Sequence, residues 1–473
     1  MSQYDGVVVG AGPNGLVGAI TLARAGWKVL LLEAGSTIGG GMRSAQLTRP
    51  GFTHDICSTV QALGVASPAF ADLPLAEHGV EWCHPEFPLA HPLDHGRAAV
   101  LHRDIVSTTL DFTPNDAHRY ERLMTPLVEH ASPLVATFLA PLQVPRAPIA
   151  AAAFGRRAIR SVHGLARSQF DGDEPRALLA GLAAHAIQPL TNKGTAGYGL
   201  FLGLLAHASG WPVARGGSQQ LADALGAIFV SLGGEIVTDH EVTDLRQIPP
   251  ARATLLDVTP RQALQITGDG FTGRYRRALT KFRYGPGVFK VDWALSGPIP
   301  WTNADVRHSG TVHLGGRLEE ITTAEAEVAA GGHPDRPYVI VVQPSVMDPS
   351  RAPAGAQVAW AYCHVPNGSA LDQTDVIERQ IERFAPGFRD VVLDRHTMTT
   401  AAMETHNANY VGGDINGGAA DLRQLFTRPV ASLHPWATPL DGLYLCSAST
   451  PPGGGVHGMC GLHAARLALA RHR

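Results

Sequence analysis

The sequence predicts an α/β fold in which both ends of the chain build one parallel sheet and a mixed α+β block is inserted between them. Two signals at opposite ends of the 473-residue chain carry this prediction. Near the N-terminus, the apolar run 7–9 meets a glycine-rich turn and then an apolar-periodic helix. Near the C-terminus, a second apolar run, 443–445, leads into another glycine-rich segment. A chain of this length can hold two or three domains with sizeable cores.

The N-terminal turn, 10–15, has glycines with distinct mechanical roles. We expect Gly10 to permit the tight turn, Gly12 to let the backbone approach a pyrophosphate, and Gly15 to let the helix pack on the strand. The start of the helix then offers free N–H groups and a positive dipole end to phosphates. The segment therefore predicts a Rossmann-like dinucleotide-binding unit.

The second strand of this unit, 28–32, ends in Glu33. A carboxylate at this place accepts the ribose hydroxyls of an adenosine, and it would repel a 2′-phosphate. Glu33 thus argues against NADP. The glycine motif alone does not separate FAD from NAD.

The segment after Glu33 contains a glycine triplet, 39–41, followed by Met42 and Arg43, and then Gly51, Phe52 and Asp55. These residues resemble the amine-oxidase and carotenoid-desaturase flavoproteins, in which a glycine pair and an arginine run along the FAD pyrophosphate. Within them the segment is most similar to the phytoene-dehydrogenase-related flavoproteins, which include retinol saturases. The resemblance implies that the cofactor is FAD.

The C-terminal segment, 441–469, resembles the carboxyl-terminal FAD motif of carotenoid desaturases. A strand leads to Ser447 and Ser449, where those proteins commonly have glycine, then to the glycines 453–455 and a helix from about Val456. The positive end of that helix would stabilise negative charge on the flavin. The resemblance also implies that the strand ending near Val242 passes the adenine. The full set of FAD-binding residues that we expect is Gly10, Gly12, Pro13, Asn14, Gly15, Glu33, Ala34, Gly40, Gly41, Met42, Arg43, Val242, Ser449, Gly455, Val456 and His457.

Three residues are candidates for proton transfer. Lys290 lies on the strand-like stretch 285–295, where amine oxidases carry a lysine that holds a water near the flavin; the alternative is a solvated ion pair with Asp292, two residues on and on the same face. Glu404 lies in the loop-like, Asn- and Gly-rich segment 403–418 together with Asp414, a further acid/base candidate; either acid could instead cap a turn. His457 could act as a base, shape the pocket, or be satisfied by backbone groups.

The middle of the chain is less informative. Thr113 and Pro114 predict a helix start, and the pattern remains mostly helical to about residue 207. The apolar run 196–206 is too short to span a bilayer, so it predicts a core helix, a wall for a lipid-like substrate, or a peripheral membrane contact. We divide the chain into an FAD-binding domain (1–75, 211–260 and 396–473) and a substrate domain (76–210 and 261–395).

Composition narrows the function further. A net charge of −3 gives no reason to expect nucleic acid. Five scattered cysteines form no CxxC pair, and the histidines show no metal-ligand spacing, so we expect no metal and a cytoplasmic location; a covalent flavin link through Cys446 or Cys460 stays open.

We therefore expect an FAD-dependent oxidoreductase that transfers hydride between a largely apolar small molecule and flavin, in C–C desaturation or saturation. The alternatives are an amine oxidase, a redox-neutral isomerase, and a non-catalytic protein stabilised by FAD. Oxygen or a quinone would reoxidise the flavin. The sequence does not determine the oligomeric state.

Overall fold

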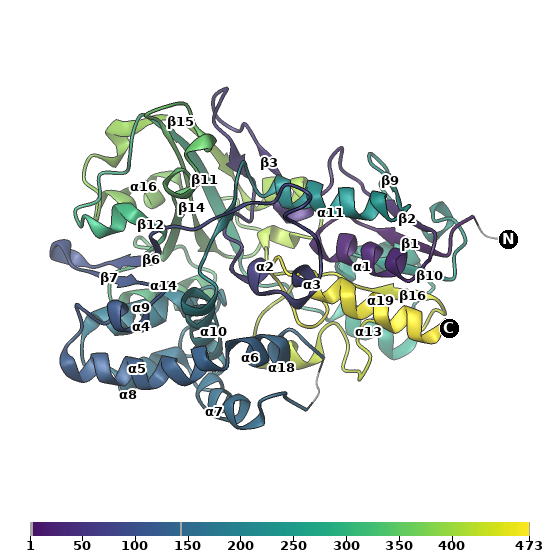
Figure 1. Cartoon of the computed structure of the whole chain (residues 1–473), viewed down its shortest axis with the longest axis horizontal. Coiled ribbons are helices and arrows are strands. Elements are labelled where there is room, and N and C mark those ends of the chain that lie inside the picture. The colour runs from purple at the N-terminus through teal and green to yellow at the C-terminus, as the bar shows by residue number, and fades with distance from the viewer. Residues whose placement is uncertain (1–2, 142–143, 473) are drawn as a thin grey trace.

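The computed structural model describes residues 3–141 and 144–472. Figure 1 shows a five-stranded sheet with its helices near both termini, a seven-stranded sheet at the opposite end of the molecule, and a group of helices beneath the second sheet. The mixed α/β architecture that the sequence predicts is thus confirmed.

The five-stranded sheet is parallel throughout and has the strand order β16-β10-β1-β2-β9. Its strands come from the beginning, the middle and the end of the chain, so both glycine-rich segments meet at one sheet. This explains why the central strands are short, uniformly apolar runs: both faces of the sheet are covered. The strands are β1 (Gly6–Val9), β2 (Val29–Leu32), β9 (Glu235–Val237), β10 (Ala253–Leu256) and β16 (Leu443–Leu445).

Side chains alternate along each strand, so both faces of this sheet carry apolar side chains, and helices cover both. Val8 and Leu31 belong to the core shared with α1 (Pro13–Arg24), α11 (Gln219–Ser231) and α19 (Met459–Arg471). In Figure 1 these three helices lie beside the sheet near the chain termini.

The opposite face packs on α12 (Pro260–Thr267) and α13 (Gly273–Thr280), because Val7 and Leu256 share a core with Ile266 of α12 and Leu279 of α13. Our division of the chain placed these helices in the substrate domain. Their apolar side chains instead complete the core of the five-stranded sheet. The inserted part begins nearer β11 than residue 261.

The seven-stranded sheet has the strand order β15-β11-β14-β13-β12-β6-β7. It is antiparallel except for the β6–β12 pair. One face forms a separate apolar core in which Trp293 meets Phe388 edge to face, with ring centroids 5.2 Å apart. The other face turns toward the rest of the molecule. The strands are β6 (Phe87–Pro92), β7 (Ala98–Leu101), β11 (Gly287–Leu295), β12 (Ser309–Leu314), β13 (Val339–Val342), β14 (Gln357–Val365) and β15 (Val392–Met398).

A group of helices covers part of this second face of the seven-stranded sheet. Thr113 caps the first long helix by accepting a hydrogen bond from the Asp116 N–H, as the sequence predicts. The expected core helix at 196–206 is confirmed as α10, most of which is buried. The helices of this group are α5 (Pro114–Glu129), α6 (Ala131–Phe138), α7 (Pro148–Ala158), α8 (Val162–Gln169), α9 (Asp173–Ala184) and α10 (Thr195–Ala208).

Shorter elements join these parts. Two small antiparallel pairs are formed by β3 (Ser44–Ala45) with β4 (His54–Asp55) and by β5 (Trp82–Cys83) with β8 (Val213–Ala214). The remaining α-helices are α2 (Ala62–Ala66), α3 (Pro68–Ala71), α4 (Ile105–Thr108), α14 (Leu318–Ala329), α15 (Pro344–Met347), α16 (Thr374–Glu382), α17 (Thr400–His406) and α18 (Leu422–Thr427).

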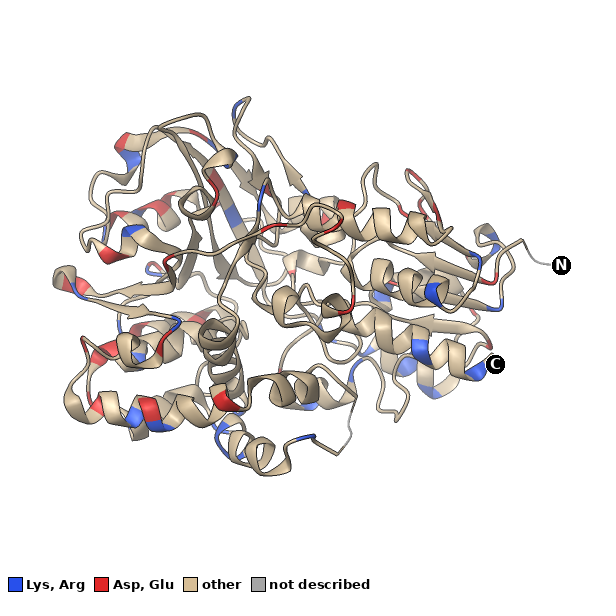
Figure 2. Cartoon of the chain, in the orientation of Figure 1, with Lys and Arg blue, Asp and Glu red and all other residues tan. Residues whose placement is uncertain are grey.

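Charged side chains are spread over the helices on the outside of the molecule (Figure 2). Figure 2 shows Arg alternating with Asp and Glu along α5, whereas the charged residues of α1, α13 and α19 are all Arg. Within residues 3–141 and 144–472, no helix combines the length and the apolar character needed to cross a bilayer.

Candidate active site

The glycine-rich turn between β1 and α1 has the geometry that the sequence predicts. Gly10 has a φ of +97°, which ordinary side chains rarely adopt. A Cβ at Gly15 would lie 1.9 Å from the Gly10 carbonyl oxygen, so α1 can approach β1 this closely only with glycine there. Gly40 also approaches this turn, since its Cβ would lie 3.0 Å from the Gly12 Cα.

Glu33 and Arg43 meet beside this turn. Arg43 Nη2 donates to Glu33 Oε1 at 2.8 Å, and both side chains are about nine-tenths buried. The Glu33 carboxylate also accepts hydrogen bonds from the Ala11 N–H (2.7 Å) and the Gly35 N–H (2.8 Å). These contacts hold a carboxylate and a guanidinium in place at the end of β2.

Asp257 is a third charged residue beside the turn, and the sequence analysis missed it. It follows β10, is 5% exposed, and its Oδ2 accepts the Gly15 N–H at 2.9 Å. Burial, with a smaller contribution from the nearby Glu33, raises the pKa of this carboxyl to about 7, although the Gly15 hydrogen bond opposes the shift. Nothing in the sequence around Asp257 marks this acid as lining a site.

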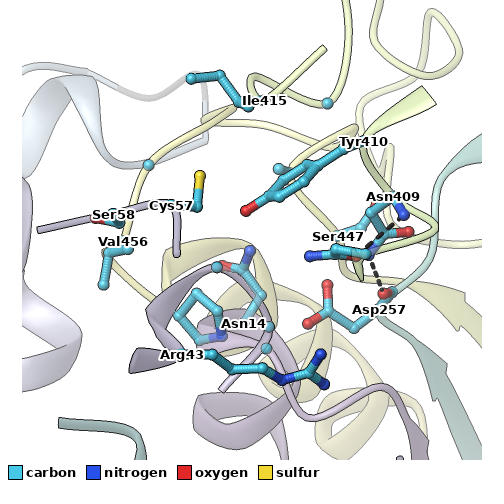
Figure 3. Close-up of a pocket in the computed structure, with 18 of the residues that line it drawn as sticks. Asn14, Arg43, Cys57, Ser58, Asp257, Asn409, Tyr410, Ile415, Ser447 and Val456 are labelled. Atoms are coloured by element: carbon cyan, nitrogen blue, oxygen red, sulfur yellow. Dashed lines mark hydrogen bonds between the residues drawn. The ribbon is translucent and has the colours of Figure 1, made fainter. Parts of the chain in front are cut away.

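A cavity of about 620 Å³ extends from this turn toward the seven-stranded sheet. In Figure 3, Asn14, Arg43 and Asp257 lie on one side, and Cys57 and Tyr410 lie across from them. Twelve of the expected cofactor-binding residues line the cavity: Gly10, Gly12, Pro13, Asn14, Glu33, Ala34, Gly40, Gly41, Arg43, Val242, Gly455 and Val456. Residues from both ends of the chain therefore share one cavity.

Four other expected cofactor-binding residues do not line the cavity. Gly15 instead provides the close helix–strand contact described above. Met42 is fully buried in the core beside α1. The Ser449 hydroxyl donates to the Gly417 carbonyl at 2.7 Å, while its neighbours Ser447 and Ala448 line the cavity. The fourth is His457.

His457 is satisfied by backbone groups. Its Nδ1 accepts the Met459 N–H at 3.0 Å, so its Nε2 carries the proton and donates to the Gly453 carbonyl at 3.2 Å. Burial lowers its pKa to about 4, so the ring is neutral at pH 7. The side chain thus caps the start of α19, and the structure does not bring it to the cavity.

Lys290 does not reach the cavity either. It is 1% exposed, and its Nζ donates to the Asp292 carboxylate and, at 3.2 Å, to the Asp55 carbonyl. The two side chains share a face as expected, but their ion pair is buried rather than solvated. Residues 54–55 of β4 cover it, and His54 Nδ1 lies 3.6 Å from Asp292.

The loop acids are also engaged elsewhere. Glu404 pairs with Arg261 at 2.5 Å and accepts the Gly412 N–H at 2.6 Å, and these contacts lower its pKa although partial burial opposes the shift. Asp414 accepts backbone N–H groups of Gly285 and Gly418 at 2.7 and 2.8 Å. Neither acid lines the cavity, and the backbone contacts of both match the turn-capping alternative that the sequence left open.

Other residues of that Asn-rich segment do line the cavity, and the sequence analysis missed them. They include Asn407, Asn409 and Tyr410. A Cβ at Gly41 would lie 2.3 Å from the Tyr410 hydroxyl, so glycine at 41 makes room for this ring. Asn409 Nδ2 donates to the Asp257 carbonyl at 2.9 Å, which fixes the loop against β10 (Figure 3). The density of Asn in this segment was the signal that could have pointed to these residues, whereas the sequence-based candidates were the acids Glu404 and Asp414.

The inner wall of the cavity is formed by the seven-stranded sheet. Trp360 and Tyr362 stack with an interplanar angle of 14° and ring centroids 5.7 Å apart. Apolar side chains from β13, α10 and the neighbouring loops continue this wall. None of the described residues that line this wall is Asp, Glu, Lys or Arg. They are Leu63, His185, Ile187, Leu202, Trp211, Thr311, Ile340, Val342, Trp360 and Tyr362.

Comparisons with known proteins agree with this architecture. Residues 8–72 match the family model described as an NAD(P)-binding Rossmann-like domain. The chain is 27% identical to the pyridine nucleotide-disulfide oxidoreductase domain-containing protein 2 of Rattus norvegicus, over 98% of this chain and 93% of that protein. It is 24% identical to a limonene dehydrogenase polypeptide of Castellaniella defragrans, over 98% of this chain and 94% of that one.

A solved structure, wild-type putrescine oxidase bound to putrescine, superposes with a TM-score of 0.64 at 17% identity and covers 99% of both chains. The chain therefore has the fold of FAD-dependent oxidoreductases, in which a Rossmann-like cofactor domain carries an inserted mixed sheet.

Proposed function

We propose that this protein is an FAD-dependent oxidoreductase acting on an uncharged, largely apolar small molecule. The observation that carries the proposal is the single cavity. One end has the glycine-rich turn, a buried arginine and two acids, and the other has an uncharged aromatic wall. Such a cavity can hold a charged dinucleotide at one end and present its reactive part to an apolar substrate at the other.

The residues at the charged end fit FAD. Asn14 is 3% exposed, and its Oδ1 has no hydrogen-bond partner among the described residues, although it lines the cavity. The turn and Asn14 would hold the pyrophosphate, Arg43 would neutralise part of its charge, and Glu33 would accept the ribose hydroxyls. Ser447, Ala448, Gly455 and Val456 would hold the flavin. FAD supplies the acceptor for the hydride that the substrate loses.

The uncharged wall favours C–C desaturation or saturation of the phytoene-dehydrogenase-like type. A wall of Trp, Tyr, Ile, Val and Leu side chains binds apolar surface and excludes water from the reacting carbon. The similarity to the limonene dehydrogenase polypeptide supports this direction, because limonene is a hydrocarbon.

Amine oxidation is the second candidate, and the structural likeness to putrescine oxidase favours it. No acid lies on the described part of the inner wall to pair with an ammonium group. We therefore rank amine oxidation below C–C oxidation.

The test is purification followed by anaerobic reduction. We expect yellow protein that releases FAD on denaturation, and bleaching of the flavin by unsaturated or saturated cyclic hydrocarbons rather than by amines. Bleaching by amines alone would favour the second candidate. Product formation without net electron transfer would indicate a redox-neutral isomerase. Protein that stays colourless after incubation with FAD would contradict the cofactor assignment.

A further inference from the structure

The inner wall of the cavity is not wholly apolar. Trp211, Thr311 and His185 line it side by side with the aromatic and aliphatic residues. Trp211 and Thr311 are 3% and 2% exposed, yet the Trp211 Nε1 and the Thr311 Oγ1 have no hydrogen-bond partner among the described residues. Buried donors are normally paired, so two unpaired groups beside one cavity indicate a ligand that satisfies them.

These residues form one cluster. The His185 and Trp211 rings meet edge to face with centroids 5.9 Å apart, and His313 lies 4.9 Å from His185 and 6.2 Å from Trp211. Thr311 lies two residues before His313 on β12, so the two share a face of the sheet.

His185 adds a further polar atom. Its Nε2 lies 2.9 Å from His313 Nε2, and this is the one hydrogen bond of its ring among the described residues, which leaves Nδ1 for the cavity. Burial lowers the pKa of His185 to about 3 and that of His313 well below its usual value, so both rings are neutral.

The two neutral rings share one hydrogen bond, so one must donate and the other accept. His313 Nδ1 is buried and unpartnered. If His313 donates through Nε2, its Nδ1 carries only a lone pair. If His313 instead accepted at Nε2, its Nδ1 would be a buried N–H without a partner, and proteins avoid an unpaired buried N–H more strongly than an unpaired acceptor. His185 then presents its Nδ1–H toward the cavity.

The cluster therefore offers the N–H groups of Trp211 and His185 and the hydroxyl of Thr311. Gln61, which also lines the cavity, contributes a buried and unpartnered acceptor, Oε1. With no Asp, Glu, Lys or Arg on the described part of this wall, the arrangement matches a neutral oxygen. A carbonyl accepts from the donors, and a hydroxyl can in addition donate to Gln61.

Resting on the proposed function, we propose that the inner wall is an oxygen-binding subsite: the substrate is an uncharged, mainly apolar molecule with one carbonyl or hydroxyl oxygen held by Trp211, Thr311 and His185. The oxygen orients the molecule, and its hydrocarbon part lies along Trp360, Tyr362, Ile340 and Val342 toward the cofactor end.

Three ring compounds of nearly equal size test this: cyclohexanone, methylenecyclohexane and protonated cyclohexylamine, each titrated into the FAD-loaded protein at pH 7. Binding is read from the change in the flavin spectrum and from the thermal shift of the protein. We expect cyclohexanone to bind about tenfold more tightly than methylenecyclohexane, the gain expected for one or two hydrogen bonds, and the ammonium compound to bind most weakly.

Two Trp-to-Phe variants separate this effect from general packing. Trp211→Phe keeps a large ring but removes one of the three donors, the unpaired N–H, so it should clearly reduce the preference for cyclohexanone. Trp360→Phe is the matched control, because the Trp360 N–H already donates to Thr59 Oγ1 at 2.8 Å; the preference should survive it.

Equal affinity for the ketone and the hydrocarbon, tighter binding of the ammonium compound, binding of none of the three, or a preference unchanged in Trp211→Phe would overturn the subsite. Colourless protein would contradict the cofactor assignment instead, and the thermal shift would still report on the subsite.

Discussion

The protein has two buried groups of charged side chains, one that lines the cavity and one that is closed off from it. One lines the cavity and contains Glu33, Arg43 and Asp257. The other is closed and contains Asp55, Asp292, Lys290 and Arg351, each at most 1% exposed. In the closed region every charge faces an opposite one: Arg351 bonds Asp55 at 3.1 Å, and Lys290 bonds Asp292.

The difference shows that burial of a charge does not by itself indicate chemistry. Charges in the closed region are paired with opposite charges and join β4 to the seven-stranded sheet, although Asp292 Oδ2 and Arg351 Nη1 have no hydrogen-bond partner among the described residues. At the cavity, Asp257 has a backbone N–H as its partner and open space beside it. A charged group is a candidate for function where the protein leaves part of its bonding capacity to a ligand.

The largest effect should come from breaking the closed region. Lys290→Met leaves Asp292 buried and without its cation, which should lower the free energy of unfolding by about 3–5 kcal/mol. Urea unfolding measures this. Below the unfolding transition, we expect the rate of flavin reduction to change little, because Lys290 does not line the cavity.

The double variant Lys290→Met/Asp292→Asn removes both charges and should recover part of the lost stability. A stable Lys290→Met protein with strongly slowed flavin reduction would instead make Lys290 catalytic, as the resemblance to amine oxidases implies.

Asp257 should couple stability to pH. Its folded pKa is about 7 and its ordinary value is 3.8, so between these values the folded carboxyl holds a proton that the unfolded one releases. The free energy of unfolding therefore falls as pH rises from about 4 to about 7, by about 3–4 kcal/mol in total. Asp257→Asn should remove this loss: we expect the cofactor-free variant to be more stable than wild type at pH 8 and equal to it near pH 4.

Unfolding curves at the two pH values measure the effect. Asp269→Asn, in an exposed loop, is the matched control and should leave the pH dependence unchanged. A parallel pH dependence in wild type and Asp257→Asn would show that another group is responsible.

Arg43 should matter for the cofactor. Arg43→Ala removes a charge-assisted contact with the pyrophosphate, so we expect FAD to bind about 10- to 100-fold more weakly. Fluorescence titration of the cofactor-free protein measures the affinity. Arg49→Ala is the control, because Arg49 is half exposed and pairs with Asp394 at the surface; it should bind FAD like wild type. Equal affinity in the two variants would remove Arg43 from the cofactor site.

Features set by local backbone geometry could be predicted from the sequence, whereas contacts between distant segments could not. Gly10 and Gly15 are dictated by local backbone geometry, so their positions could be read within one short segment. Partners of charged side chains come from distant segments. The face on which Lys290 lies was predictable from strand alternation, but its cover, Asp55 on β4, was not. Trp211, just before β8, and Thr311, on β12, meet at the cavity only through the packing of distant segments, and no single short stretch of sequence carries a signal of that packing.

The smallest effect should come from Glu404, whose contacts lie at the partly exposed edge of the Asn-rich loop. Its side chain is 32% exposed, so the ion pair with Arg261 is screened by water and should contribute less than about 1 kcal/mol. Glu404→Gln keeps an oxygen that can accept the Gly412 N–H and removes only the charge. We therefore expect urea unfolding and the rate of flavin reduction to match wild type closely. Glu404→Ala, which also leaves the Gly412 N–H unpaired, should be the less stable of the two. If Glu404→Gln instead slowed flavin reduction tenfold or more without loss of stability, the acid would belong to the cavity, and the distinction between satisfied and open charges would fail at this loop.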